Sequence, residues 1–93
     1  MSALPRREAT AKIINKRGLH ARASAKLVEA AARFQSEITV TKDGQSVDAR
    51  SIMGLMMLAA SLGSEVAIEA VGIDADAALT AILALIEAKF GEE

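Results

Sequence analysis

Apolar and polar residues alternate in three segments of the chain, a pattern that predicts half-buried β-strands. In the second segment, Ile38 and Val40 alternate with Thr39 and Thr41. Asp43-Gly44 follows at once, and this dipeptide is a strong signal for a two-residue hairpin turn. A short return strand is therefore predicted over Gln45–Ala49. The three alternating segments are Glu8–Asn15, Glu37–Lys42 and Glu65–Val71.

Two longer segments carry apolar residues at helical spacing. The first, Ala21–Phe34, is rich in alanine, the best helix former. The second, Ala75–Lys89, follows Asp74, which is a plausible N-cap. A short apolar segment, Ile52–Leu58, predicts a third helix that begins after Ser51. The stripe of the last helix consists of Leu79, Ile82, Leu83, Ile86 and Phe90.

The predicted order is strand, helix, strand, strand, helix, strand, helix. A hairpin and half-buried strands favour an antiparallel or mixed sheet with one covered face, and helices on that face give a two-layer sandwich. A chain of 93 residues forms one domain with a modest core. Residues 1–7 are polar, contain the only proline, and are expected to fray.

Composition removes several classes of function. The chain has no cysteine and one histidine, so we expect no disulfide, no zinc site and no other metal or cofactor. A net charge of -1 and only two aromatic residues, both Phe, argue against nucleic-acid binding. Residues 1–7 lack the apolar core of a signal peptide, and the longest apolar run, 52–60, is too short to span a membrane. These features predict a cytoplasmic domain.

The only histidine, His20, lies between a predicted strand and the first predicted helix. Gly18 gives the backbone freedom just before it, and a helix N-terminus favours an anion through its unpaired N–H groups. Arg22, with Arg17 as a further candidate, can donate charge-assisted hydrogen bonds to a phosphoryl oxygen. A neutral imidazole is a nucleophile near pH 7, so this site suits a phosphorylated histidine. A surface or structural histidine is the alternative interpretation.

Two motifs resemble those of one family. Gly18-Leu19-His20-Ala21-Arg22 resembles the active-site signature of HPr, the histidine-containing phosphocarrier of the phosphoenolpyruvate-dependent phosphotransferase system. Ser51-Ile52-Met53-Gly54-Leu55-Met56 resembles the serine-site segment of that family, at the family's spacing. The resemblance covers residues 8–90. It implies an α+β fold, an open-faced two-layer sandwich of a four-stranded antiparallel sheet with three helices on one face, in the order βαββαβα.

The resemblance also implies roles for individual residues. His20 would accept a phosphoryl group on Nδ1 from phosphorylated enzyme I and pass it to an EIIA-type protein, with Arg22 as the catalytic or phosphate-binding arginine. The protein would then be a monomeric carrier and not a self-contained enzyme. Ser51 is either a plain helix N-cap or also a regulatory site for HPr kinase/phosphorylase. Leu19, Met53 and Met56 would dock the partners.

The chain departs from the family pattern at three points. Arg17 stands where the family usually has a small or polar residue, and it either adds attraction for a phosphate or is simply solvated. Ala23 stands where most members have proline, which loosens the first turn but removes no chemical group. The first helix carries few lysines near the expected docking face, which favours the nitrogen-related branch over the sugar-transport branch. One alternative is a regulatory module that acts through phospho-Ser51 on a kinase or transcription regulator. Another is an unrelated ferredoxin-like or ligand-sensing domain, which would not explain the Ser51 segment.

Overall fold

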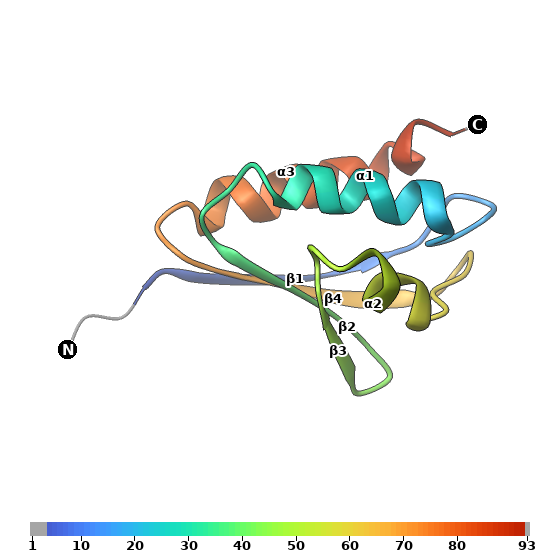
Figure 1. Ribbon diagram of the computed structural model, residues 1–93, viewed down its shortest axis with the longest axis horizontal. Helices are drawn as coiled ribbons and strands as arrows, with labels where there is room; N and C mark the ends of the chain where they lie inside the picture. The colour runs from blue at the N-terminus through green and yellow to red at the C-terminus, as the bar shows by residue number, and fades with distance from the viewer. Residues whose placement is uncertain (1–3, 93) are drawn as a thin grey trace.

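Four strands and three helices follow one another in the predicted order in the computed structural model, which describes residues 4–92 (Figure 1). The predicted α+β class and the open-faced sandwich are confirmed. A turn of 3₁₀-helix ends the described chain. The elements are β1 (Arg6–Lys12), α1 (Ala21–Ala31), β2 (Glu37–Lys42), β3 (Gln45–Asp48), α2 (Ile52–Met57), β4 (Glu65–Val71), α3 (Ala75–Glu87) and the 3₁₀ turn Lys89–Gly91.

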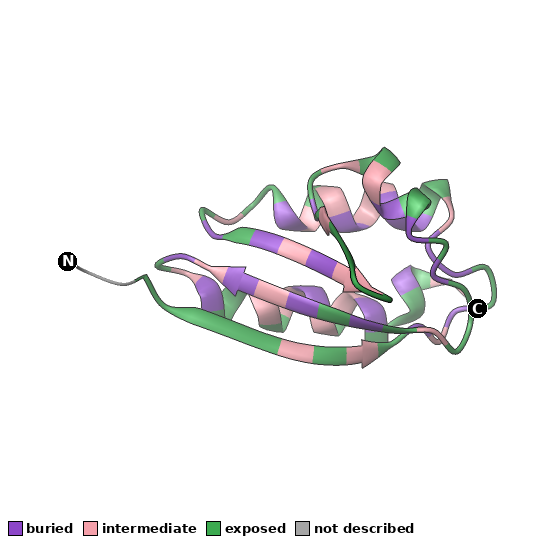
Figure 2. Ribbon diagram, turned by 90° about the horizontal axis from the view of Figure 1, so that it is seen from below, coloured by how far each residue is buried: buried purple, intermediate pink, exposed green. Residues whose placement is uncertain are grey.

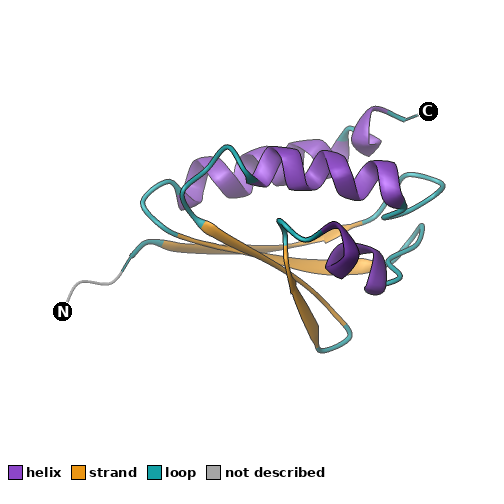
Figure 3. Ribbon diagram, viewed as in Figure 1, coloured by secondary structure: helices purple, strands orange, loops and turns teal. Residues whose placement is uncertain are grey.

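The four strands form one antiparallel sheet in the order β1-β4-β2-β3. The register places Val40 of β2 opposite Ile68 of β4, so apolar residues of neighbouring strands share one face. Figure 2 shows the resulting alternation of buried and exposed positions along β4. The other face of the sheet is not covered by helices (Figure 3), which explains why its residues are mainly charged or hydroxylic.

Helices α1 and α3 lie side by side over the apolar face of the sheet. Leu27 of α1 and Ile82 of α3 are completely buried between the two layers. The short helix α2 contacts α1 and β3 and contributes the buried Leu55. Burial of these side chains supplies the main driving force for folding, since each large aliphatic group contributes about 1.5 to 3 kcal/mol.

Four predicted boundaries need correction. β1 ends at Lys12 and not at Asn15, since its pairing with β4 stops where Lys12 meets Glu65. β1 begins at Arg6, inside the segment expected to fray, and Arg6 and Arg7 pair with Val71 and Ala70. Helix α1 ends at Ala31 and not at residue 34, because the next residues turn away through i→i+3 bonds. Helix α3 ends at Glu87, and the chain reverses through Lys89 and Phe90, which adopt φ of 58° and 55°. Residues 1–3 of the segment expected to fray lie outside the described residues.

Asp74 occupies the N-cap position of α3, as predicted, but its side chain does not cap the helix. Its carboxylate instead accepts hydrogen bonds from the backbone N–H groups of Gln35 and Ser36, both at 2.9 Å, and from the Ser36 hydroxyl at 2.5 Å. These bonds lower the pKa of Asp74 below its ordinary value, the Ser36 hydroxyl first. This Asp74 junction fixes the loop between α1 and β2 against the start of α3.

No helix among residues 4–92 has the length and apolar character needed to cross a membrane.

Candidate functional site

The turn before α1 brings two distant parts of the chain into contact. The Leu19 N–H donates to the Ala60 carbonyl at 2.8 Å, and Gly18 adopts φ of 64°. A Cβ on Gly18 would lie 2.3 Å from the Ala60 oxygen, far inside van der Waals contact. Gly18 is buried, and its missing side chain permits this close approach, while its support of a bound phosphate stays a prediction.

His20 is the N-cap residue of α1. Its backbone is extended, and its Nδ1 accepts a hydrogen bond from the backbone N–H of Arg22 at 3.2 Å. A backbone N–H can only donate, so Nδ1 presents its lone pair to the first turn of the helix. In the neutral ring the proton then resides on Nε2. The side chain of His20 is 15% exposed, and the site is therefore shielded but accessible.

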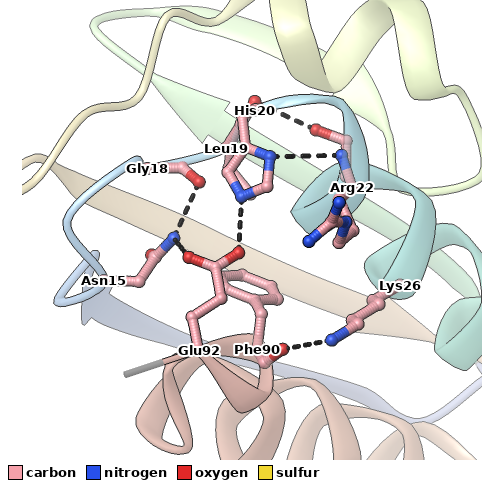
Figure 4. A network of polar contacts seen from close by, with 9 residues as sticks. Asn15, Gly18, Leu19, His20, Arg22, Lys26, Phe90 and Glu92 are labelled. Carbon is pink, nitrogen blue, oxygen red and sulfur yellow. Dashed lines mark hydrogen bonds and ion pairs between the residues drawn. The ribbon is translucent and has the colours of Figure 1, made fainter.

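Glu92 lies on the other side of the His20 ring (Figure 4). Its Oε2 is 2.5 Å from His20 Nε2, and its Oε1 accepts from Asn15 Nδ2 at 3.0 Å. Asn15 Nδ2 also donates to the Gly18 carbonyl at 2.9 Å. The hydrogen bonds from Asn15 and then His20 hold the pKa of Glu92 below its ordinary value, so this carboxylate is charged near pH 7. We call this group the Glu92 junction.

Residues 88–92 form a C-terminal hook that delivers Glu92 to the ring. The aromatic ring of Phe90 is completely buried, which fixes the middle of the hook in the core. Lys26 of α1 donates from Nζ to the Phe90 carbonyl at 2.6 Å. Figure 4 shows Lys26, Phe90 and Glu92 in succession along one side of α1. The C-terminal end of the described chain is thus held by α1, the helix that His20 caps.

The two candidate arginines differ in their surroundings. Arg22 is exposed in the first turn of α1, four residues before Lys26 and therefore on the same side of the helix. Arg17 is exposed in the preceding loop, and its charge helps to lower the pKa of Glu92. The backbone N–H of Arg22 thus contacts Nδ1 of the His20 ring. The charge of Arg17 instead stabilises the Glu92 carboxylate, which contacts Nε2.

The predicted docking residues separate into exposed and buried ones. Met53 and Met56 of α2 are 69% and 41% exposed, as an apolar contact surface requires. Leu19 is only 5% exposed and packs in the core, so its side chain is not on the surface where the resemblance places it. Four exposed side chains define what we call the α2 surface: Ile52, Met53, Met56 and Met57.

Ser51 caps α2, in agreement with its structural interpretation. Its Oγ accepts from the backbone N–H of Gly54 at 3.0 Å, and the residue is half-buried. The Ser51 hydroxyl therefore lies at the start of the helix that carries the α2 surface. Capping does not by itself exclude modification at this position, since Ser51 is not fully enclosed.

Sequence reasoning missed Asn15 and Glu92 as parts of the site. Both contact the histidine turn, yet Glu92 is 72 positions away from His20 and belongs to no apolar pattern. Phe90 was counted in the apolar stripe of the last helix, and Gly91 directly after it is the one signal in the sequence for a change of direction. Apart from these additions, the structure brings together the predicted imidazole, the helix N-terminus and the first-turn arginine.

The fold and the site define a small open-faced sandwich with a single nucleophilic imidazole at the N-terminus of its first helix. A family model described as the PTS HPr component phosphorylation site matches residues 7–88. The phosphocarrier protein HPr of Cupriavidus necator is 56% identical over 80 residues, which cover 86% of this chain and 90% of that protein. The phosphocarrier protein NPr of Shewanella violacea is 48% identical over 80 residues, covering 86% and 88%.

Solved structures agree with the sequence relatives. The crystal structure of HPr from Thermoanaerobacter tengcongensis superposes with a TM-score of 0.90 at 49% identity, covering 94% of this chain and 98% of that one. The chain belongs to the HPr family of phosphocarrier proteins of the phosphotransferase system. Its general role is that of a phosphocarrier, and membership implies partners within that system.

Proposed function

We propose that His20 is the phosphorylated residue, that it receives the phosphoryl group on Nδ1 from phosphorylated enzyme I, and that it passes the group to an EIIA-type protein. The observation that carries this proposal is the hydrogen bond from the Arg22 backbone N–H to Nδ1, at 3.2 Å between the nitrogens, because it identifies Nδ1 as the ring nitrogen that carries the lone pair. Nδ1 also faces the N-terminus of an 11-residue helix, where negative charge is favoured.

The same N–H supports the phosphorylated state. When Nδ1 bonds to phosphorus, the Arg22 N–H can no longer donate to the nitrogen and is in position to donate to a phosphoryl oxygen. The exposed Arg22 guanidinium then adds a charge-assisted hydrogen bond, which is stronger than a neutral one. Phosphoryl transfer depends mainly on positioning and charge stabilisation, so a small open site is sufficient once a partner covers it.

The test is incubation with enzyme I and labelled phosphoenolpyruvate. We expect label that is lost in acid and stable in base, as a phosphohistidine is, and no label on His20→Ala. Circular dichroism controls for folding, since the substitution also removes an N-cap. A wild-type protein without label, or equal label on His20→Ala, would refute the proposal.

We further propose that the α2 surface docks these partners. Methionine suits a surface that must fit more than one protein, because its side chain is flexible and polarisable. Met53 is the most exposed of the four residues and can be changed with little effect on packing. We expect Met53→Lys to raise the KM of enzyme I for this protein and to leave the melting temperature unchanged. An unchanged KM would remove this surface from the docking site.

Ser51 is proposed as a regulatory phosphorylation site for a kinase of the HPr kinase/phosphorylase type. A phosphate there would place negative charge beside the α2 surface and oppose an anionic phosphoryl group on an incoming partner. We expect Ser51→Asp to slow phosphorylation of His20, while Ser51→Asn, which keeps a good N-cap without charge, has a smaller effect. Equal rates for Ser51→Asp and wild type would exclude the inhibitory role.

The nitrogen-related branch is proposed as the physiological setting, supported by the scarcity of lysine on α1 and by the NPr relative. The curated relatives also include HPr proteins at higher identity, so a direct comparison is needed. Phosphorylation rates with nitrogen-type and sugar-type enzyme I would decide between the branches. Equal or faster phosphorylation by the sugar-type enzyme would count against this assignment.

A further inference from the structure

The C-terminal hook holds Glu92 more firmly than a surface glutamate. Phe90 is completely buried two residues before it, and the Lys26 ammonium binds the Phe90 carbonyl at 2.6 Å. Asn15 then binds the Glu92 carboxylate from below the histidine turn, at 3.0 Å. The side chain of Glu92 is 18% exposed, compared with 15% for His20, so the two groups shield each other from water.

We propose that Glu92 is a positioning residue for His20: its carboxylate accepts the Nε2 proton, holds Nδ1 toward the N-terminus of α1, and stabilises the positive charge that the ring acquires when Nδ1 is phosphorylated. This inference rests on the proposed phosphorylation of His20. It extends that proposal by assigning the other ring nitrogen a partner contributed by the C-terminal hook.

The chemistry of the transfer explains why a carboxylate at Nε2 is effective. The lone pair of Nδ1 forms the N–P bond, and the bond between phosphorus and the donor's leaving atom breaks with its electron pair remaining on that atom. The Nε2 proton stays in place, so both ring nitrogens are now substituted and the ring is positively charged. The attraction between the ring and a carboxylate fixed at Nε2 is therefore stronger in the transition state and product than in the neutral starting state. An interaction that strengthens in the transition state is the condition for accelerating the transfer.

The charges around the ring agree with this role. Arg22 and Arg17 supply positive charge for the phosphoryl group, but both would oppose a positively charged ring. Glu92 is the carboxylate that contacts His20 among the described residues, and it compensates that repulsion. Asn15 and Lys26 contribute by fixing where the carboxylate lies.

The experiment compares four proteins: wild type, Glu92→Ala, Glu92→Gln and Glu87→Gln. Glu87 is exposed at the end of α3, so its variant makes the same change in net charge without altering a contact of His20. The first readout is phosphorylation by enzyme I and labelled phosphoenolpyruvate with this protein as the varied substrate. The second is the imidazole Nε2–H signal in NMR spectra, which a strong bond to a carboxylate shifts downfield and protects from exchange.

We expect Glu92→Ala to lower kcat about tenfold, because one charge-assisted hydrogen bond is lost in the transition state, and to leave KM within about twofold of wild type. The kcat of Glu92→Gln should lie between those of wild type and Glu92→Ala, since a neutral amide oxygen still accepts the hydrogen bond from Nε2–H. The downfield Nε2–H signal should be present in wild type and Glu87→Gln and absent in Glu92→Ala. A purely structural contact would change the melting temperature and the Nε2–H signal in Glu92→Ala, but it would leave kcat unchanged.

The outcomes separate the two proposals. If wild type takes up no label, the proposed function fails, and the role of Glu92 fails with it. If wild type is labelled and Glu92→Ala matches it in kcat, the phosphohistidine stands and only the role of Glu92 is overturned. An equal loss of kcat in Glu87→Gln and Glu92→Gln would also overturn it, because the effect would then come from net charge.

Discussion

The Glu92 junction and the Asp74 junction lie at opposite ends of α3 and use the same type of group for different purposes. In each, a carboxylate accepts hydrogen bonds from residues far away in the sequence, and these bonds lower its pKa. Asp74 binds two backbone N–H groups and a buried hydroxyl, which cannot take part in chemistry. Glu92 binds the one side chain in the molecule that is an imidazole.

The difference shows that the hydrogen-bond donor determines whether a carboxylate contributes to stability alone or also to the reaction. At the Asp74 junction the donors are fixed in the fold, so the carboxylate stabilises the native state and little else. At the Glu92 junction one donor is a ring whose charge changes during phosphoryl transfer, so the same kind of bond couples to the reaction. Each junction also has one of the two phenylalanines nearby, Phe34 in the α1–β2 loop and Phe90 in the hook, and this arrangement provides matched variants.

The largest effect is expected for Phe90→Ala. The ring is completely buried, so its removal should lower the free energy of unfolding by about 3 to 5 kcal/mol, measured by urea denaturation. Release of the hook should also slow phosphorylation to the level of Glu92→Ala. Phe34→Ala, at a half-buried position, should cost less stability and leave the phosphorylation rate unchanged. Equal slowing by the two variants would show that the junctions are not functionally distinct.

A smaller effect, on stability alone, is expected for Asp74→Asn and Ser36→Ala. Each removes a hydrogen bond between the α1–β2 loop and the start of α3, and Ser36 is completely buried. Both variants should have a lower melting temperature in scanning calorimetry and a kcat within about twofold of wild type. The two effects should not simply add, because both substitutions act on the one hydrogen-bond network around the Asp74 carboxylate. A large fall in kcat with an unchanged melting temperature would contradict this division of roles.

The two carboxylates should act alike in acid. The ordinary pKa is 3.8 for Asp74 and 4.5 for Glu92, and the folded-state pKa of each carboxyl is lower. Each carboxylate therefore stabilises the fold fully at a pH above its ordinary pKa. This stabilisation is lost as the pH falls through the lower folded-state pKa. Unfolding free energies measured from about pH 5 to about pH 3 should therefore decrease, and less steeply in Asp74→Asn and in Glu92→Gln. A slope unchanged in both variants would show that neither carboxylate retains its hydrogen bonds in solution.

The smallest effect is expected for Arg7→Gln. Arg7 pairs with Asp76 at 2.6 Å near the start of α3, but the two side chains are 51% and 76% exposed. Exposed ion pairs contribute less than about 1 kcal/mol, so the melting temperature should hardly change. This variant is the background against which the Asp74 variants are compared. If Arg7→Gln proved as destabilising as Asp74→Asn, the stabilisation at the Asp74 junction could not be attributed to burial of its hydrogen-bond donors.

Strands β2 and β4 were predicted better than β1 and the ends of the long helices, for a physical reason. The boundaries of β2 and β4 agree with prediction because strict alternation with one covered face is visible in the sequence itself. Helix α1 ends three residues early because Asp74, from a distant segment, binds the residues that follow it. Phe90 was correctly expected to be apolar and inward-facing, yet it reaches the core through a left-handed turn that helical spacing does not reveal.

The residues of the candidate site likewise fall into two groups, those that a local motif predicts and those that only the fold brings in. The imidazole, the helix N-terminus and Arg22 are local in sequence, so a short motif was enough to place them together. Leu19 belongs to the same motif but packs in the core, because neighbours in sequence at a turn point in different directions. Phe90 and Glu92 join the site only through folding. Their contacts with Lys26, Asn15 and His20 span 64, 77 and 72 positions, and no periodic pattern specifies contacts over such separations.

The position of Gly91 between Phe90 and Glu92 has a consequence for motion. Phe90 can leave the core only by local unfolding, which is slow and costly, whereas Glu92 is joined to it through a residue without a side chain. Rotation about the Gly91 backbone and the Glu92 side-chain bonds is enough to withdraw the carboxylate from the ring, and such terminal motions occur in nanoseconds to microseconds. The anchor and the contact therefore move on different timescales, so the carboxylate can leave the ring and return to it while the buried Phe90 keeps the hook in place.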